Sequence, residues 1–151
     1  MLIGNKDVIA YDFIGVNNSM GIVDIYIGNH HLTYEDNSHY YPMIVNGIKK
    51  EIEYFQGTDL SLKDEYKEYA IDELFEHIHN QETQIHEQVE MCSDFFTYDL
   101  STKRATFYVY QQEANLVFFG NLYNSNDIIT VTIPKDDYVA LLSKLLALLI
   151  S

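Results

Sequence analysis

Alternating hydrophobic and polar residues, the pattern of half-buried β-strands, mark the first part of the chain. The alternation predicts a strand over residues 7–16 and a second over residues 21–27, with the turn Asn17–Asn18–Ser19 between them. Gly28–Asn29 is another tight-turn signal, and a short strand is expected from there to Tyr34. We therefore expect antiparallel strands joined by short turns. The second strand should turn three residues inward, namely Val23, Ile25 and Ile27.

The next segment predicts a loop and a hairpin. Residues 35–41 are polar and are expected to form a loop. Beyond them, residues 43–45 and 48–55 flank the dipeptide Asn46–Gly47 and are expected to form a hairpin. Because both residues of such a dipeptide tolerate positive φ, it is the strongest short hairpin signal.

Helical spacing of apolar residues begins after this predicted hairpin. Ser61 and Asp64 have the spacing of a capping box at a helix N-terminus. The pattern predicts either one long central helix of about 28 residues or two helices broken near Asn80. The apolar stripe consists of Ile71, Leu74, Phe75, Ile78, Ile85, Val89 and Cys92.

The second half of the chain predicts a strand meander and a final helix. Pro134 ends the last strand, and the leucine-rich residues 135–150 are expected to dock on the sheet as a helix. The predicted fold is a single α+β domain over residues 1–151, with a mainly antiparallel meander sheet, a long central helix and a packed C-terminal helix. The predicted strands of this half cover residues 95–100, 104–111, 116–123 and 127–133.

The acidic composition narrows the choice of partner. The 151 residues include 23 acids and 9 bases, and the formal net charge is −14. Nucleic acids and anionic membranes are bound through lysine and arginine, so neither is expected as a partner. A basic protein partner is compatible with the charge, because complementary fields speed association. Solubility alone would also account for an acidic chain.

Cysteine content and terminal sequences indicate a cytoplasmic protein. Cys92 is the single cysteine, so no internal disulfide can form and a reducing compartment is expected. The first residues lack the basic and then apolar pattern of a signal peptide. The apolar C-terminal segment is too short and too interrupted to span a bilayer. The oligomeric state stays open.

The acids are concentrated in the predicted central helix. Residues 59–90 contain ten acids and two lysines, a local net charge of −8. On a helical wheel six of these acids share a side away from the apolar stripe. They could form a docking surface for a basic protein or simply a solvated helix face, and the sequence favours neither. The six candidates are Glu65, Glu68, Asp72, Glu76, Glu87 and Glu90.

Two tyrosines beside the polar loop are further partner-binding candidates. Tyr40 and Tyr41 carry large amphipathic rings, which are frequent anchors at protein interfaces. Ordinary packing of both rings against the sheet is an equally good interpretation.

No catalytic, metal or cofactor site is predicted. Cys92 lies on the apolar stripe, which indicates a buried thiol rather than a nucleophile. Glu76 and His79 have a spacing that can share a metal in a four-helix bundle, but only two helices are predicted here. Phosphate-loop, dinucleotide and nucleophile-elbow motifs are absent. A carboxylate pair assembled from distant residues stays possible, although nothing in the sequence singles one out.

Both ends of the chain resemble the bacterial toxin-immunity family known as immunity protein forty-two. The shared features at the start are Gly4–Asn5, a strand at residues 8–13 and a second strand ending Ile25–Tyr26–Ile27–Gly28–Asn29. Near the end they are a strand closing with Thr132–Ile133–Pro134, then Tyr138 and a leucine-rich helix. Tyr26 replaces the family's usual Trp and the turn dipeptide is reversed. The central acidic region aligns with nothing in the family.

The resemblance implies a cytoplasmic antidote that binds a cognate toxin domain and is not an enzyme. Such toxins are often nucleases of contact-dependent inhibition or polymorphic-toxin systems. An acidic antidote suits a basic nuclease, because its carboxylates can occupy the surface that would hold phosphate. The alternatives are a small hydrolase or ligand-binding domain of unknown substrate, and an acidic DNA mimic that inhibits a nucleic-acid enzyme.

Overall fold

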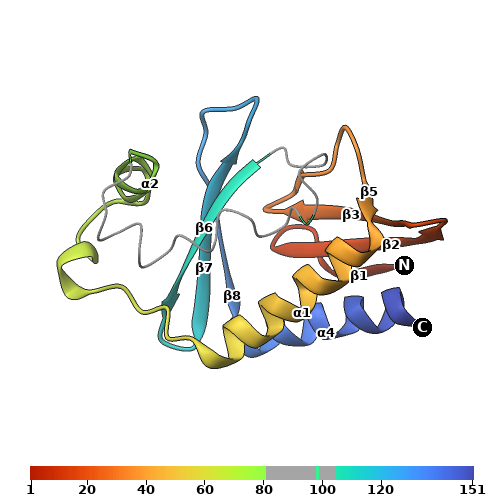
Figure 1. The fold of residues 1–151 in the computed structure, drawn as a ribbon. Helices are drawn as coiled ribbons and strands as arrows, with labels where there is room; N and C mark the ends of the chain where they lie inside the picture. The colour runs from red at the N-terminus through yellow and green to blue at the C-terminus, as the bar shows by residue number, and fades with distance from the viewer. Residues whose placement is uncertain (81–97, 99–104) are drawn as a thin grey trace.

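The computed structural model describes residues 1–80, 98 and 105–151. Sheet A is built by the N-terminal strands, in the order β1-β2-β3-β4, with β5 pairing against β3. Figure 1 shows these strands on one side of the molecule. All of these pairings are antiparallel. The strands are β1 (Leu2–Asn5), β2 (Ile9–Asn17), β3 (Met20–Ile27), β4 (His30–His31) and β5 (Ser38–Tyr40).

Sheet B is a separate antiparallel meander of three strands, in the order β6-β7-β8. They are β6 (Ala105–Gln112), β7 (Asn115–Leu122) and β8 (Ile129–Pro134). The chain before the sheet adds to its edge, since Ser61 forms a parallel bridge with Gln111 and the Gln111 backbone N–H donates to the carbonyl of Leu60 at 3.0 Å.

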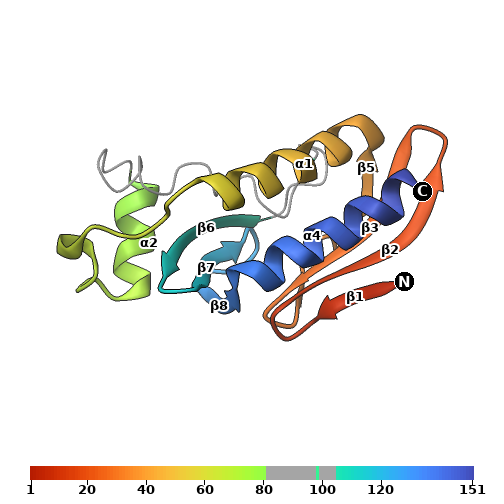
Figure 2. The ribbon, with the colours of Figure 1, turned by 90° about the horizontal axis from the view of Figure 1, so that it is seen from below.

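Two long helices cross both sheets on the same side. They are α1 (Tyr41–Gly57) and α4 (Lys135–Ile150), and they run antiparallel to each other (Figure 2). At one end, Ile44 of α1 and Leu149 of α4 pack against Gly21 of sheet A. At the other end, Phe55 of α1 and Tyr138 of α4 place their rings on Phe118 of sheet B, with centroids 6.2 and 5.0 Å away. The helix pair therefore joins the two sheets into one core.

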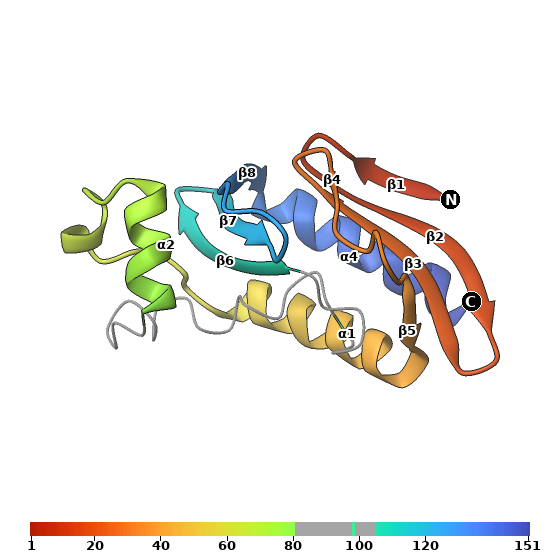
Figure 3. The same cartoon turned by 90° about the horizontal axis from the view of Figure 1, so that it is seen from above.

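A shorter helix covers the opposite face of sheet B. It is α2 (Ile71–His79), preceded by the 3₁₀ turn η1 (Asp64–Tyr66). Phe75 of α2 lies 5.5 Å from Tyr108 of β6, centroid to centroid, and Tyr108 packs in turn on Phe119. Sheet B is thus packed between α2 on one face and the α1–α4 pair on the other, as Figure 3 shows from above.

The predicted hairpin over residues 43–55 is wrong, because α1 occupies this segment. Its buried residues follow helical spacing, but one of them is Glu51, whose charge interrupts the apolar pattern in the sequence. Asn46–Gly47 forms no turn. A Cβ on Gly47 would lie 2.7 Å from a ring carbon of Tyr98, so glycine here allows the Tyr98 ring to approach the helix. Tertiary packing has overridden a local turn preference.

The central region is not one long helix over its described part. Residues 60–62 run beside β6, η1 makes a single turn, and Ala70 is extended, with φ −64° and ψ 155°. α2 begins only at Ile71 and ends before Asn80, where the alternative prediction placed a break. Residues 81–92 of the predicted helix, with Glu87, Glu90 and Cys92, lie outside the described residues.

The predicted capping box at Ser61 and Asp64 is wrong, because Ser61 bridges to Gln111 and neither η1 nor α2 has a side-chain cap. Several other sequence predictions are confirmed for the residues that the structure describes. The fold is α+β with antiparallel sheets, although the strands divide into two sheets rather than one. Strands β2 and β3, the last three strands and the C-terminal helix match the predicted segments closely, whereas β1 was not predicted. Residues 35–41 are not all loop, because β5 covers Ser38–Tyr40 and α1 begins at Tyr41. The strand predicted over 95–100 lies outside the description except for Tyr98.

Gly120 provides a test of the packing in sheet B. A Cβ at this position of β7 would lie 2.0 Å from the carbonyl oxygen of Thr106 and 2.7 Å from the Cα of Phe107. Neither backbone atom can move without distorting β6, so Gly120→Ala should lower the free energy of unfolding by about 3 kcal/mol in urea titrations. Gly57→Ala is the matched control, because nothing lies within 4 Å of its Cβ. Equal stability of the two variants would contradict this close approach of β6 and β7.

Candidate functional site

A concentration of negative charge lies on residues 59–80, here called the acidic lobe. The lobe contains seven exposed acids and two lysines, a local net charge of −5. It projects from sheet B at the side of the molecule farthest from the termini (Figure 3). The seven acids are Asp59, Asp64, Glu65, Glu68, Asp72, Glu73 and Glu76.

The candidate acids within the lobe come from different local structures. Glu65 lies in η1, Glu68 follows it in a turn, and Asp72 and Glu76 lie one helical turn apart on α2. All four are exposed. The structure brings them to one lobe, but they do not share one helix face, because only Asp72 and Glu76 lie on α2. Because α2 buries Leu74, Phe75 and Ile78 against sheet B, its acids are directed to its other sides.

A groove of about 620 Å³ runs between α2 and the turn after β7. Asp72 and Glu76 line its helical side, and Asn121 and Asn126 line the opposite side. His79 also lines it and stacks on Phe75 with a centroid distance of 5.5 Å. The groove therefore combines two carboxylates with amide groups, a lining suited to cationic and hydrogen-bonding groups of another protein.

The candidate tyrosines lie at the other end of the molecule, beside β5 (Figure 1). Tyr40 is 45% exposed, whereas Tyr41 is half-buried and its hydroxyl donates to the carbonyl of Leu149 at 3.0 Å. Tyr41 therefore ties the start of α1 to the end of α4. The structure does not bring these two tyrosines together with the acidic lobe.

A polar cluster around Asp24 was not predicted from the sequence. Asp24 Oδ1 accepts hydrogen bonds from His31 Nε2 at 2.6 Å and from Thr33 Oγ1 at 3.0 Å, and Oδ2 accepts one from Asn37 at 3.2 Å. Partial burial opposes ionisation of this carboxyl, but the three hydrogen bonds outweigh it and lower the pKa of Asp24. The sequence offered one signal for this cluster. Asp24 faces outward in its predicted strand, and His30–His31 follow directly after the next turn.

The same cluster continues into stacked side chains on sheet A. The His31 ring stacks on Tyr26 at a centroid distance of 4.7 Å, and Lys6 Nζ lies 4.3 Å from the Tyr26 ring centroid. The pair of Asp24 and His31 does not form a nucleophilic triad, because the Thr33 hydroxyl donates to Asp24 rather than to the imidazole. The arrangement is an ordered polar surface.

The centre of the fold contains a second cluster that sequence reasoning missed. Glu51 of α1 is 5% exposed, and its Oε2 accepts hydrogen bonds from the hydroxyls of Tyr98 at 3.1 Å and Tyr138 at 3.3 Å. The Tyr11 hydroxyl lies 3.2 Å from that of Tyr98 and 3.3 Å from that of Tyr138. Placing Glu51 in a hairpin hid its position on the buried side of a helix.

Burial controls the protonation of this cluster. Desolvation raises the pKa of Glu51 from 4.5 to about 8, although the hydrogen bonds from Tyr98 and Tyr138 oppose the rise. Among the described residues no cation pairs with the carboxyl. Burial also raises the pKa of Tyr98 and Tyr138, and the Coulombic effect of Glu51 adds to it. Burial therefore favours the neutral form of Glu51, which bonds two tyrosines that are both linked to Tyr11.

Two general features bear on function. Within residues 1–80, 98 and 105–151, no three His, Cys, Asp or Glu side chains gather closely enough to hold a metal ion. No helix in the described part of the chain is both long and apolar enough to cross a membrane.

Comparison with known proteins gives a match in fold. No family model and no curated protein matches the sequence. Among solved structures, the chain is similar to CdiI from Burkholderia dolosa AUO158, with a TM-score of 0.66 and 11% sequence identity. The match covers 97% of this chain and 99% of that chain. CdiI is an immunity protein of contact-dependent growth inhibition, so the fold agrees with the resemblance to toxin-immunity proteins expected from the sequence.

The raised pKa of Glu51 predicts a specific pH dependence of stability. Below pH 4.5 the carboxyl is protonated in both the folded and the unfolded chain. Between pH 4.5 and about 8 the unfolded chain loses the proton while the folded chain keeps it, so the free energy of unfolding falls as pH rises. Glu51→Gln should remove this contribution, because the amide stays neutral and its oxygen can still accept from Tyr98 and Tyr138.

Urea titrations at pH 5, 6.5 and 8 measure the effect. The stability of Glu51→Gln relative to the natural chain should improve steadily across this range, by a few kcal/mol in total. Glu53→Gln, at an exposed position of the same helix, should show no such trend. Parallel pH profiles for Glu51→Gln and the natural chain would show that Glu51 is ionised at neutral pH.

Proposed function

We propose that this protein is a non-catalytic immunity protein, which binds a cognate bacterial toxin domain and neutralises it in the cytoplasm. The observation that carries the proposal is the similarity in fold to CdiI over nearly the whole length of both chains. The short motifs at the two ends of the sequence support the same assignment. In the described residues, the Thr33 hydroxyl beside the Asp24–His31 pair donates to the carboxylate rather than to the imidazole, and Glu51 is buried in the core.

The charge of the chain supports a basic toxin of the nuclease type as the partner. A net charge of −14 creates a negative field that speeds the approach of a basic protein and disfavours acidic ones. A nuclease must hold phosphate with basic side chains, and carboxylates of an inhibitor can occupy the same groups.

The acidic lobe is the proposed contact surface. Glu65, Glu68, Asp72 and Glu76 are exposed there, and the groove beside α2 adds a concave surface lined by carboxylate and amide groups. Glu87 and Glu90 continue the proposed surface in sequence. Tyr40 is a candidate for a separate contact, because its exposed ring lies away from the lobe. Tyr41 is the weaker candidate of the two tyrosines, because its hydroxyl is engaged by α4.

Protection of cells tests the function directly. The proposal predicts that the gene immediately upstream encodes a large secreted protein, and the C-terminal domain of that protein is then the partner to produce in a sensitive host. Co-expression of this chain should restore growth, and the purified proteins should form a complex in which toxin activity is lost. Growth arrest of equal severity with and without this chain would contradict the proposal. Displacement of the chain by free DNA would identify it as a mimic of nucleic acid.

Charge reversal tests the contact surface. The double variant Asp72→Lys and Glu76→Lys should slow association with the toxin domain at low salt about tenfold, because it reverses the local field. The control Asp7→Lys with Glu53→Lys makes the same change in net charge at exposed positions outside the lobe. Stopped-flow measurements at several salt concentrations compare the two. An equal slowing in both variants would place the interface elsewhere, and thermal unfolding checks that each variant is folded.

A further inference from the structure

A second cavity, of about 300 Å³, lies between the acidic lobe and the end of β6. Three tyrosines line it, Tyr66 from η1, Tyr69 from the following turn and Tyr110 from β6, and Leu62 and Leu74 add apolar surface. We call it the tyrosine pocket. The backbone bond from Gln111 to Leu60 holds the lobe beside β6 and so brings the three rings together.

The rings of the tyrosine pocket are held in place but are not all sealed. Tyr66 is 8% exposed, while Tyr69 and Tyr110 are half-buried. Tyr66 and Tyr69 have a centroid distance of 6.3 Å, and Tyr69 contacts the His77 ring edge-on at 4.6 Å. Burial raises the pKa of Tyr110, which keeps its phenol neutral. Three aromatic rings thus line one opening, and aromatic rings attract cations because each ring face carries negative electrostatic potential.

The charges around the pocket also favour a cation. Glu113 lines it, and the acidic lobe that forms one wall has a net charge of −5. Lys67 lines it as well, but its Nζ pairs with Asp64 at 2.9 Å. Lys135 donates to the side chain of neighbouring Gln111 at 3.4 Å. An anionic or purely apolar group would therefore bind more weakly in this pocket than a cation with a flat apolar surface.

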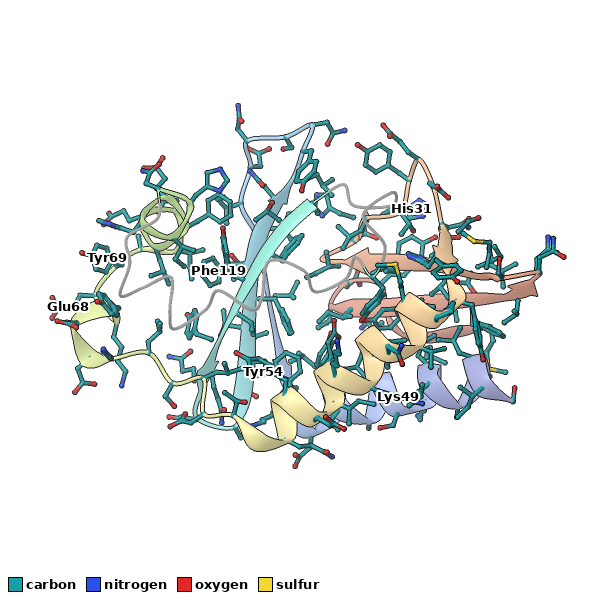
Figure 4. All side chains as sticks on the ribbon, viewed as in Figure 1. His31, Lys49, Tyr54, Glu68, Tyr69 and Phe119 are labelled. Carbon is teal, nitrogen blue, oxygen red and sulfur yellow. The ribbon has the colours of Figure 1, made fainter. Side chains whose placement is uncertain are left out.

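We propose that the tyrosine pocket receives an arginine side chain of the partner protein, with the guanidinium against the tyrosine rings and near Glu113. Arginine fits better than lysine, because its planar, weakly hydrated head stacks on aromatic faces. The inference rests on the proposed function, since a basic toxin supplies the arginine. The arginine contact would fix one point of the complex, in addition to the long-range electrostatic attraction by the exposed acids. Figure 4 shows Tyr69 beside Glu68 at the outer end of the lobe, far from Lys49 and His31.

The pocket can be tested without the toxin. N-acetyl-arginine amide is titrated into the protein while the aromatic NMR signals of Tyr66, Tyr69 and Tyr110 are followed. We expect saturable shifts at these rings with a dissociation constant in the millimolar range. The neutral analogue N-acetyl-citrulline amide should cause no such shifts, because cation–π attraction requires the charge. Equal binding of both compounds, or shifts confined to other residues, would overturn the proposal.

Variants of the pocket separate ring loss from loss of fold. Tyr69→Ala should weaken arginine amide binding about fourfold, whereas Tyr69→Phe keeps the ring and should bind like the natural chain. Glu113→Asn removes a charge and suits the φ of +56° at this position, so it should weaken binding without disturbing the rings. If Tyr69→Ala unfolds, the Glu113→Asn and Tyr69→Phe results decide. Unchanged binding in Glu113→Asn together with unchanged binding in a folded Tyr69→Ala would refute the site.

The toxin domain then separates the pocket from the proposed function. Tyr69→Ala should raise the dissociation constant of the complex about tenfold, while Tyr69→Phe and the exposed control Tyr34→Ala, away from the lobe, should not. Full toxin affinity in Tyr69→Ala would exclude the pocket as an anchor but leave the proposed function standing. Failure of the natural chain to bind the toxin would instead refute the function, and the arginine titration would still report on the pocket.

Discussion

Two antiparallel helices, each spanning two small sheets, are the constraint on which the rest of the fold depends. Both sheets are small, with five strands in sheet A and three in sheet B, so neither can enclose a core alone. The helices α1 and α4 cover one face of each. Each helix offers one end to each sheet: Ile44 and Leu149 meet sheet A, and Phe55 and Tyr138 meet sheet B. Burial of these apolar residues stabilises both sheets at once, because the same helix surface is continuous across them. This shared layer makes the core a single cluster from Ile9 to Leu149.

The buried polar cluster around Glu51 links the two helices to sheet A and to Tyr98. Burying Glu51 costs free energy, and its tyrosine partners recover only part of it, so an apolar residue could be more stable at the same position. What the carboxyl adds is specificity, because its hydrogen bonds are satisfied only when α1, α4 and Tyr98 are correctly placed. Tyr11 joins sheet A to the same point. The Tyr98 ring approaches Gly47 so closely that no larger residue fits at position 47 of α1.

The proposed binding surface is separate from this centre. The acidic lobe packs on sheet B through Leu74, Phe75 and Ile78 and keeps its carboxylates exposed. Repulsion between such acids costs a few tenths of a kcal/mol per pair, which a core of this size can offset. The lobe can therefore concentrate charge, and the tyrosine pocket beneath it can provide a precise contact, without altering the network around Glu51.

The sequence by itself determined the elements whose pattern is local: the alternating strands β2 and β3, the meander of β6 to β8 and the leucine-rich α4. It also determined the acidity of residues 59–80. The fold similarity to CdiI agrees with the resemblance that the two ends of the sequence show to immunity proteins. Only the tertiary structure decided that residues 41–57 are helical, because Glu51 has the polarity of a surface residue until its tyrosine partners, up to 87 residues away, are in place. It also divided the strands into two sheets and held residues 60–62 in an extended segment against Gln111. These outcomes depend on contacts between distant segments, and local propensity carries no information about them.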